Sequence, residues 1–235
     1  RSQSNTIILK NFSSRINFWF KNDSIMKKLL ALLFLLFLLS SPSVFADDIS
    51  DFTIEGISIG DSLLDYMTED EILEEIELSI SLNEYYYLKE PLKYVHVYLY
   101  NYSSTFEGNL SFLLKNTPSS KYISNKNEKY IIQSIRGMID FIEDLDGCMK
   151  KRDEIVKELS EMFPNERKSE HSYSDSEDPS GKSMKYDVDF IFNSGDEIEI
   201  SCDNYEETYR KKHNWSEGLN VAIYTAETVN WLRDY

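Results

Sequence analysis

The chain has 235 residues, of which 25 are basic and 41 are acidic, so its formal net charge at pH 7 is −16. This excess of negative charge excludes a nucleic-acid binder that works through a net-positive surface, and no nucleic-acid partner is expected. A chain of this size can bury roughly 70% of its unfolded surface in one core, so we expect a single domain.

The segment 26–46 has the pattern of a secretory signal peptide. It begins with the first methionine of the chain, continues with two lysines and an unbroken apolar run of 11 residues, and ends on the small residue Ala46. A run of this length is too short to cross a bilayer, which takes about 20 residues in a helix. We therefore predict cleavage after Ala46 and no stable membrane span, with an uncleaved anchor as the alternative.

Cleavage after Ala46 would leave residues 47–235 as the mature domain, in the periplasm or outside the cell. Residues 1–46 contain 6 of the 25 basic and 1 of the 41 acidic residues, so the mature chain would carry a net charge of −21. Residues 1–25 lack a methionine and are rich in Asn, Ser and Lys. This composition is typical of untranslated upstream sequence, and we exclude the segment from the predicted fold.

Two cysteines, Cys148 and Cys202, remain in a chain that is expected to reach an oxidising compartment. The apolar spacing of a predicted helix at 143–163 places Cys148 on its buried stripe. Alternation over 197–203 places Cys202 on the apolar face of a strand. We predict a disulfide between them, with two free buried thiols as the alternative. Neither cysteine has a Cys or His neighbour in sequence, and no metal site or cofactor is predicted.

Hydrophobic periodicity and turn residues predict the elements of the mature chain. Asp61 and Ser62 follow a glycine turn and are expected to cap a short helix, and Thr68 with Glu71 forms a capping box for the next one. In the first part of the chain we expect a strand at 52–59, a short helix that ends at 67, and a second helix with Ile72, Leu73 and Ile76 buried. Strands at 94–100, 110–114 and 130–141 and the helix at 143–163 follow. The last part is expected to contain strands at 186–192 and 197–202 joined by a hairpin turn at 193–195, a strand at 219–223, and a terminal helix capped by Thr225.

Runs of strands joined by short turns favour antiparallel pairing, because parallel strands need a crossover. The predicted fold class is therefore α+β, an antiparallel β-sheet with helices packed on one face and one disulfide. The order of elements is also that of a diverged βαββ duplication. The tract 164–182 is rich in Ser, Glu, Asp, Pro and Gly, and it is predicted to be a mobile insertion that contributes nothing to the core.

Two short motifs near the start of the mature chain suggest a serine hydrolase. Residues 60–63, Gly-Asp-Ser-Leu, resemble the signature of the GDSL esterases and lipases, and the resemblance implies Ser62 as the nucleophile. That family's later motifs, G-x-N-D and D-x-x-H, do not occur in this sequence. The overlapping Gly-x-Ser-x-Gly at 56–60 matches a nucleophile elbow, but its isoleucines favour an extended chain. An esterase using Ser62 is the alternative to a glycine turn with a helix cap.

The tyrosine-rich strand 94–100 has the most unusual composition. Tyrosine is enriched in binding surfaces, although the half-buried face of a sheet is an alternative reading. The basic, aromatic segment 209–215 could hold an anionic partner or the acidic body of its own fold. The candidate binding residues are Tyr94, His96, Tyr98 and Tyr100 on one strand face, and Arg210, Lys211, Lys212 and Trp215 in the basic segment.

Four features define the layout of the chain: the predicted signal peptide, the I-x-I-G-D-S-L-L-D sequence at 57–65 near the start of the mature chain, Cys148 on a Lys/Glu-rich helix, and the N-S-G-D hairpin at 193–196 before Cys202. This layout resembles small uncharacterised exported α+β proteins of AT-rich marine bacteria. The resemblance implies no activity, because no function is assigned to that group. We expect a non-catalytic exported binding or accessory module, rather than an enzyme, with an unknown envelope or extracellular partner.

Overall fold

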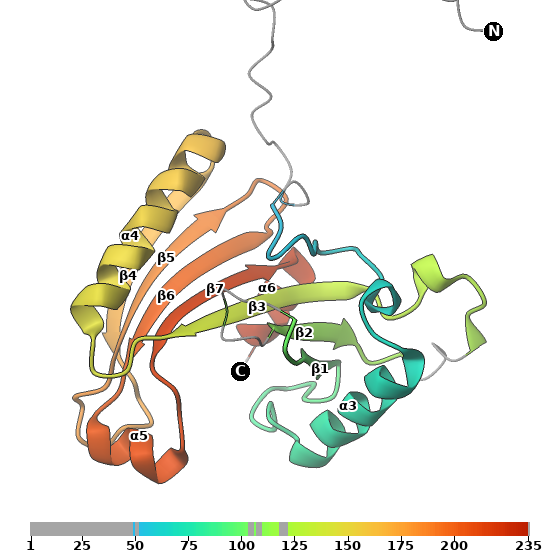
Figure 1. Cartoon of the computed structure of the whole chain (residues 1–235), viewed down its shortest axis with the longest axis horizontal. Helices are drawn as coiled ribbons and strands as arrows, with labels where there is room; N and C mark the ends of the chain where they lie inside the picture. The colour runs from blue at the N-terminus through green and yellow to red at the C-terminus, as the bar shows by residue number, and fades with distance from the viewer. Residues whose placement is uncertain (1–48, 50–51, 103–105, 107–109, 118–121, 235) are drawn as a thin grey trace, which may run out of the picture. The chain divides into compact units, whose positions relative to one another are not determined.

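A computed structural model describes residues 49, 52–102, 106, 110–117 and 122–234, which belong to one compact unit (Figure 1). The predicted signal peptide and the segment upstream of it lie outside the described residues. Among the helices that are described, none combines the length and the apolar character needed to cross a membrane.

Seven strands form one antiparallel sheet with the order β1-β2-β3-β7-β6-β5-β4, which confirms the predicted α+β class. Two consecutive three-stranded meanders, β1 to β3 and β4 to β6, are joined by β7 in the middle of the sheet. A diverged duplication stays a prediction. The strands are β1 (Tyr94–Leu99), β2 (Leu110–Lys115), β3 (Ile132–Asp140), β4 (Arg167–Ser174), β5 (Met184–Ile191), β6 (Glu197–Asn204) and β7 (Gly218–Tyr224).

Helices pack on both faces of this sheet. The longest, α4, lies over one side of the β4 to β6 half (Figure 1), and its buried Cys148 and Leu159 belong to the main core. The terminal helix α6 packs on the opposite face, where Trp231 contacts the Tyr94 and Leu113 cluster. The prediction that helices pack on one face is therefore wrong in this detail, because α4 covers one face and α6 packs on the other. The helices are α3 (Glu69–Leu82), α4 (Leu145–Met162), α5 (Glu207–His213) and α6 (Ala226–Leu232).

The predicted disulfide joins α4 to β6 inside the core. Cys148 and Cys202 are bonded, their Cα atoms are 6.1 Å apart, and both residues are buried. The alternative of two free thiols is thereby excluded. The bridge fixes α4 on one face of the sheet, so α4 does not cover the other face of β5 and β6.

Helix α3 runs along the outer edge of β1. Its predicted capping box is present, since Thr68 and Glu71 exchange side-chain-to-backbone hydrogen bonds. Two α3 side chains accept hydrogen bonds from the backbone of β1, Ser79 from His96 N at 2.8 Å and Glu75 from Tyr98 N at 3.2 Å. These contacts satisfy backbone donors that an edge strand would otherwise leave free.

Several predicted segments differ from the structure. The expected strand at 52–59 is a tight turn with a single bridge between Ile54 and Ile57, because Glu55 and Gly56 adopt positive φ angles. Leu73 is exposed, although its neighbour Ile72 is buried. The position of α3 at the sheet edge explains this narrower buried stripe.

The tract 164–182, predicted as a mobile insertion outside the core, contains strand β4 at residues 167–174. This strand pairs with β5 over its whole length, while nearly all of its side chains are exposed. Its polar composition excludes it from the core, but the backbone ladder needs no apolar side chains. The basic, aromatic segment 209–215, for which no element was predicted, is helical as far as His213, where helix α5 ends.

Candidate functional site

The sheet face opposite α4 carries a row of side chains that crosses six neighbouring strands. The registers align Tyr98, Ser111, Arg136, Ala222, Glu199 and Asp189, from β1 through β2, β3, β7 and β6 to β5. Directly paired residues point to the same side of a sheet. Arg136 is therefore flanked by two small residues, which leave its side chain accessible from this face.

Two adjoining hollows lie on this face and share His96, Ser111 and Arg136. The larger measures about 430 Å³, within the range of about 300–1,000 Å³ that is typical of small-molecule sites. The smaller measures about 220 Å³. We call them together the Arg136 groove; its lining includes Tyr85, His96, Tyr98, Tyr100, Ser111, Arg136 and Tyr224.

The guanidinium of Arg136 has few partners in the part of the chain that the structure describes. It donates one hydrogen bond, from Nη2 to the Tyr224 hydroxyl at 3.0 Å, and no described carboxylate lies within 4.0 Å of it. Arg152, Arg210 and Arg233, in contrast, each have a carboxylate partner. A guanidinium has five N–H donors, so most of those on Arg136 remain available to a ligand.

The ring of His96 is held in a fixed orientation between two side chains. Its Nε2 atom lies 2.9 Å from the Tyr85 hydroxyl, and its Nδ1 atom contacts the Glu84 carboxylate. This hydrogen bond from His96 lowers the pKa of Glu84, and burial raises the pKa of Tyr85 well above its usual range. Because the Tyr85 phenolate is so unfavourable, the chain of contacts positions the imidazole and does not create a tyrosine nucleophile.

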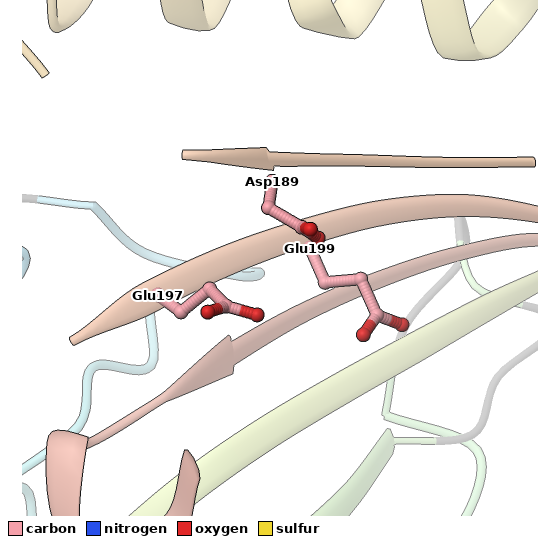
Figure 2. Close-up of side chains that lie close together, drawn as sticks. All are labelled: Asp189, Glu197 and Glu199. Atoms are coloured by element: carbon pink, nitrogen blue, oxygen red, sulfur yellow. The ribbon is translucent and has the colours of Figure 1, made fainter. Parts of the chain in front are cut away.

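A cluster of three carboxylates occupies the other half of the same face (Figure 2). One oxygen from each of Asp189, Glu197 and Glu199 lies within 4.8 Å of the others, and this is the one group with metal-ligand spacing among the described residues. Burial, followed by the charges of its two neighbours, raises the pKa of Asp189 to about 7. Burial also raises the pKa values of Glu197 and Glu199. Oxygen ligands of this kind could hold a hard cation or share protons.

The structure separates the predicted binding residues of the tyrosine-rich strand. His96, Tyr98 and Tyr100 line the larger hollow. Tyr94 is only 1% exposed and packs against Trp231, with ring centroids 4.8 Å apart. It therefore belongs to the packing beneath α6 and is not available as a binding surface.

The basic segment is largely neutralised by carboxylates of the same chain. Arg210 lies 3.4 Å from Glu143 and 3.6 Å from Glu217, and Lys211 pairs with Glu207. Of the other two candidate binding residues in this segment, Lys212 is exposed on α5, whereas the ring of Trp215 packs against Tyr205 and Tyr209. These contacts favour the alternative in which the basic segment pairs with acidic residues of its own fold, and not with an anionic partner.

The hydroxyl of Ser62 neither caps a helix nor contacts a histidine. It is 4% exposed and donates a hydrogen bond to the carbonyl oxygen of Lys129 at 2.8 Å. The prediction of a side-chain cap is therefore wrong, and the following element is only a short 3-10 turn, Leu63–Asp65. Asp61 instead stabilises the turn by accepting hydrogen bonds from Ser58 N and the Tyr66 hydroxyl.

Replacing Ser62 with Ala is expected to lower the free energy of unfolding by about 1–3 kcal/mol, because the buried carbonyl of Lys129 loses its donor. Urea unfolding of the variant would measure this. Ser81→Ala removes an exposed hydroxyl that donates to Leu78 O on α3, and it should change stability by no more than about 0.5 kcal/mol. Stoichiometric labelling of Ser62 by a fluorophosphonate, with stability unchanged in Ser62→Ala, would contradict this structural role.

No protein-family model, curated protein sequence or solved structure matches this chain. The groove offers an accessible guanidinium, an oriented imidazole and several tyrosine rings, which are binding groups. Arg136 was not among the residues predicted from sequence; a lone arginine within the mostly apolar pattern of β3 was the one local signal for it.

Proposed function

We propose that the protein is a non-catalytic binding module that holds a small molecule in the Arg136 groove. The observation that carries this proposal is the combination, in one hollow of about 430 Å³, of an accessible Arg136 with the rings of His96, Tyr98 and Tyr100. The contacts of His96 with Tyr85 and Glu84 hold one wall in place before a ligand arrives. A preformed wall lowers the conformational entropy lost on binding.

The contacts of Ser62 support binding over esterase chemistry. A serine becomes a nucleophile when an oriented base removes its proton. Each of the three histidines has described contacts elsewhere: His96 with Tyr85, His171 with Ser169, and His213 with the ring of Tyr209. The hydroxyl of Ser62 is meanwhile directed to a backbone carbonyl.

The proposed location is the periplasm or the extracellular space, with a ligand or partner of the envelope or the surroundings. The Cys148–Cys202 bridge supports this location, because disulfides form and persist mainly outside the reducing cytosol. The signal-peptide pattern at 26–46 supports it independently.

Titration of the labelled protein with a library of small ring compounds should shift backbone amide resonances around the groove, at 96–100, 134–138 and 220–224. Ser111→Trp places an indole in both hollows and should abolish these shifts, because Ser111 lines both of them. Ser172→Trp makes the same change at an exposed site on β4 and should leave binding intact. Shifts that scatter over the surface, or binding that survives Ser111→Trp in a folded variant, would refute a binding site in the groove.

A further inference from the structure

We infer that the Arg136 groove selects ligands in which a single carboxylate is attached to a ring, with the carboxylate bound by Arg136. This inference rests on the proposed function and adds the chemical class of the ligand. It is carried by three features of the groove: a guanidinium that has no carboxylate partner among the described residues, a nearby group of carboxylates, and a series of aromatic rings beside the guanidinium.

The guanidinium supplies the anion site. Arg136 lines both hollows and uses one described hydrogen bond, to Tyr224, although the protein has a large excess of carboxylates. The next acidic residue in its row is Glu199, two strands away, which corresponds to about 10 Å between backbones. The charge of Glu199 acts on Arg136 without a described ion pair, and Asp140 lines the larger hollow as well. A planar fork of N–H donors matches both oxygens of a carboxylate, so an external carboxylate can supply the direct partner that the described residues do not.

The acidic half of the face limits the charge of the ligand. Asp189, Glu197 and Glu199 lie beyond β7 on the same face as Arg136. A second ligand charge increases the attraction to Arg136 and the repulsion by these carboxylates in the same proportion. The cost of taking the ligand out of water rises with the square of its charge, and the one guanidinium of the groove neutralises a single negative charge. The ring monocarboxylate is therefore favoured over a phosphate ester of the same ring.

The rings next to Arg136 supply the second contact. Tyr98 and Tyr100 are stacked, with centroids 6.0 Å apart and an interplanar angle of 17°, and His96 lies 5.6 Å from Tyr98. Tyrosine offers a flat apolar face with a polar edge, which suits both an aromatic ring and the face of a sugar ring. An aromatic carboxylate and a uronic acid share this chemistry, and the test separates them.

Calorimetric titrations with phenylacetate and glucuronate, compared with phenylacetamide and glucose, test the inference. At least one carboxylate should bind about tenfold or more tightly than its neutral analogue, because it gains charge-assisted hydrogen bonds. The pair that shows this difference identifies the aromatic or the sugar class. Phenyl phosphate should bind more weakly than phenylacetate; tighter binding of the phosphate would overturn the preference for a monoanion.

Variants of Arg136 locate the effect. Arg136→Gln should remove the advantage of the carboxylate over its neutral analogue, and Arg136→Lys, which keeps the charge but loses the planar fork, should retain only part of it. Arg167→Gln makes the same charge change at an exposed position of β4 and should leave the advantage intact. All three arginine variants can be checked for folding by their amide spectra.

The outcomes distinguish the inference from the proposed function. If charged and neutral rings bind the groove with equal affinity, or if the preference survives in folded Arg136→Gln, the inference is overturned and the binding function stands. If none of these compounds shifts the groove amides and the wider ring library fails as well, both are overturned.

Discussion

Loss of the Cys148–Cys202 bridge is expected to lower the free energy of unfolding by about 4 kcal/mol. The bridge closes a loop of 54 positions, and in the chain-entropy model a loop of this length restricts the unfolded ensemble by that amount. Domains of this kind have total stabilities of about 5–15 kcal/mol, so the loss is a large fraction of the whole. Urea unfolding of the parent and of the Cys148→Ala/Cys202→Ala double variant would measure it.

The double variant also provides the control for reduction. Reductant should lower the unfolding midpoint of the parent protein and leave that of the variant unchanged, because only the parent has a bond to break. The folded variant should keep α4 on the sheet, since Leu159 stays in the core and Arg152 still contacts Glu170 and the Tyr186 carbonyl. A bridge that stabilises the fold would be ruled out if reductant left the unfolding midpoint of the parent protein unchanged while full alkylation showed that both thiols had been released.

The disulfide could be predicted because each cysteine belongs to a short local pattern. The three-and-four spacing around Cys148 and the alternation around Cys202 both indicate an apolar face without reference to the rest of the chain. The same holds for the capping box of Thr68 and Glu71. Strand β4 lacks such a pattern, because its side chains face solvent and its conformation depends on the ladder with β5.

Only those residues of the candidate site that lie close together in sequence could be predicted to share a face. His96, Tyr98 and Tyr100 alternate on one strand, so the sequence placed them together on a face. The partnership of Arg136 with Tyr224 joins residues 88 positions apart, and it depends on β7 entering the sheet beside β3. Nothing in the local pattern of either strand specifies that neighbour.

The carboxylate cluster has the same origin. Alternation placed Glu197 and Glu199 opposite Cys202 on β6, but the approach of Asp189 follows from the register of the β5–β6 hairpin. The turn at 193–195 sets that register, and a slip by one residue would move Asp189 to the α4 face. The hairpin turn thus determines the pairing of the strands and, by bringing the three carboxylates together, contributes to the raised pKa of Asp189.

Replacing Asp189 with Asn is expected to stabilise the protein above pH 7 by up to about 4 kcal/mol and to have little effect below pH 4. The pKa of Asp189 is raised from 3.8 to about 7 by burial and by Glu197 and Glu199. Between these two values the folded protein keeps a proton that the unfolded chain has released, so the stability contributed by this group falls as pH rises. The limit of about 4 kcal/mol follows from about 1.4 kcal/mol for each pKa unit.

Unfolding free energies of the parent and the variant at intervals from pH 4 to pH 8 would measure this, and the difference between the two proteins is the decisive quantity. Glu69, Glu84 and several other acids have lowered pKa values and stabilise the fold as pH rises, but they do so equally in both proteins. Glu74→Gln, which removes an exposed carboxylate from α3, is the matched control for the loss of one negative charge. An Asp189→Asn variant that is less stable than the parent at pH 8 would show that the ionised carboxylate is itself stabilising, because a cation or another partner then neutralises the cluster.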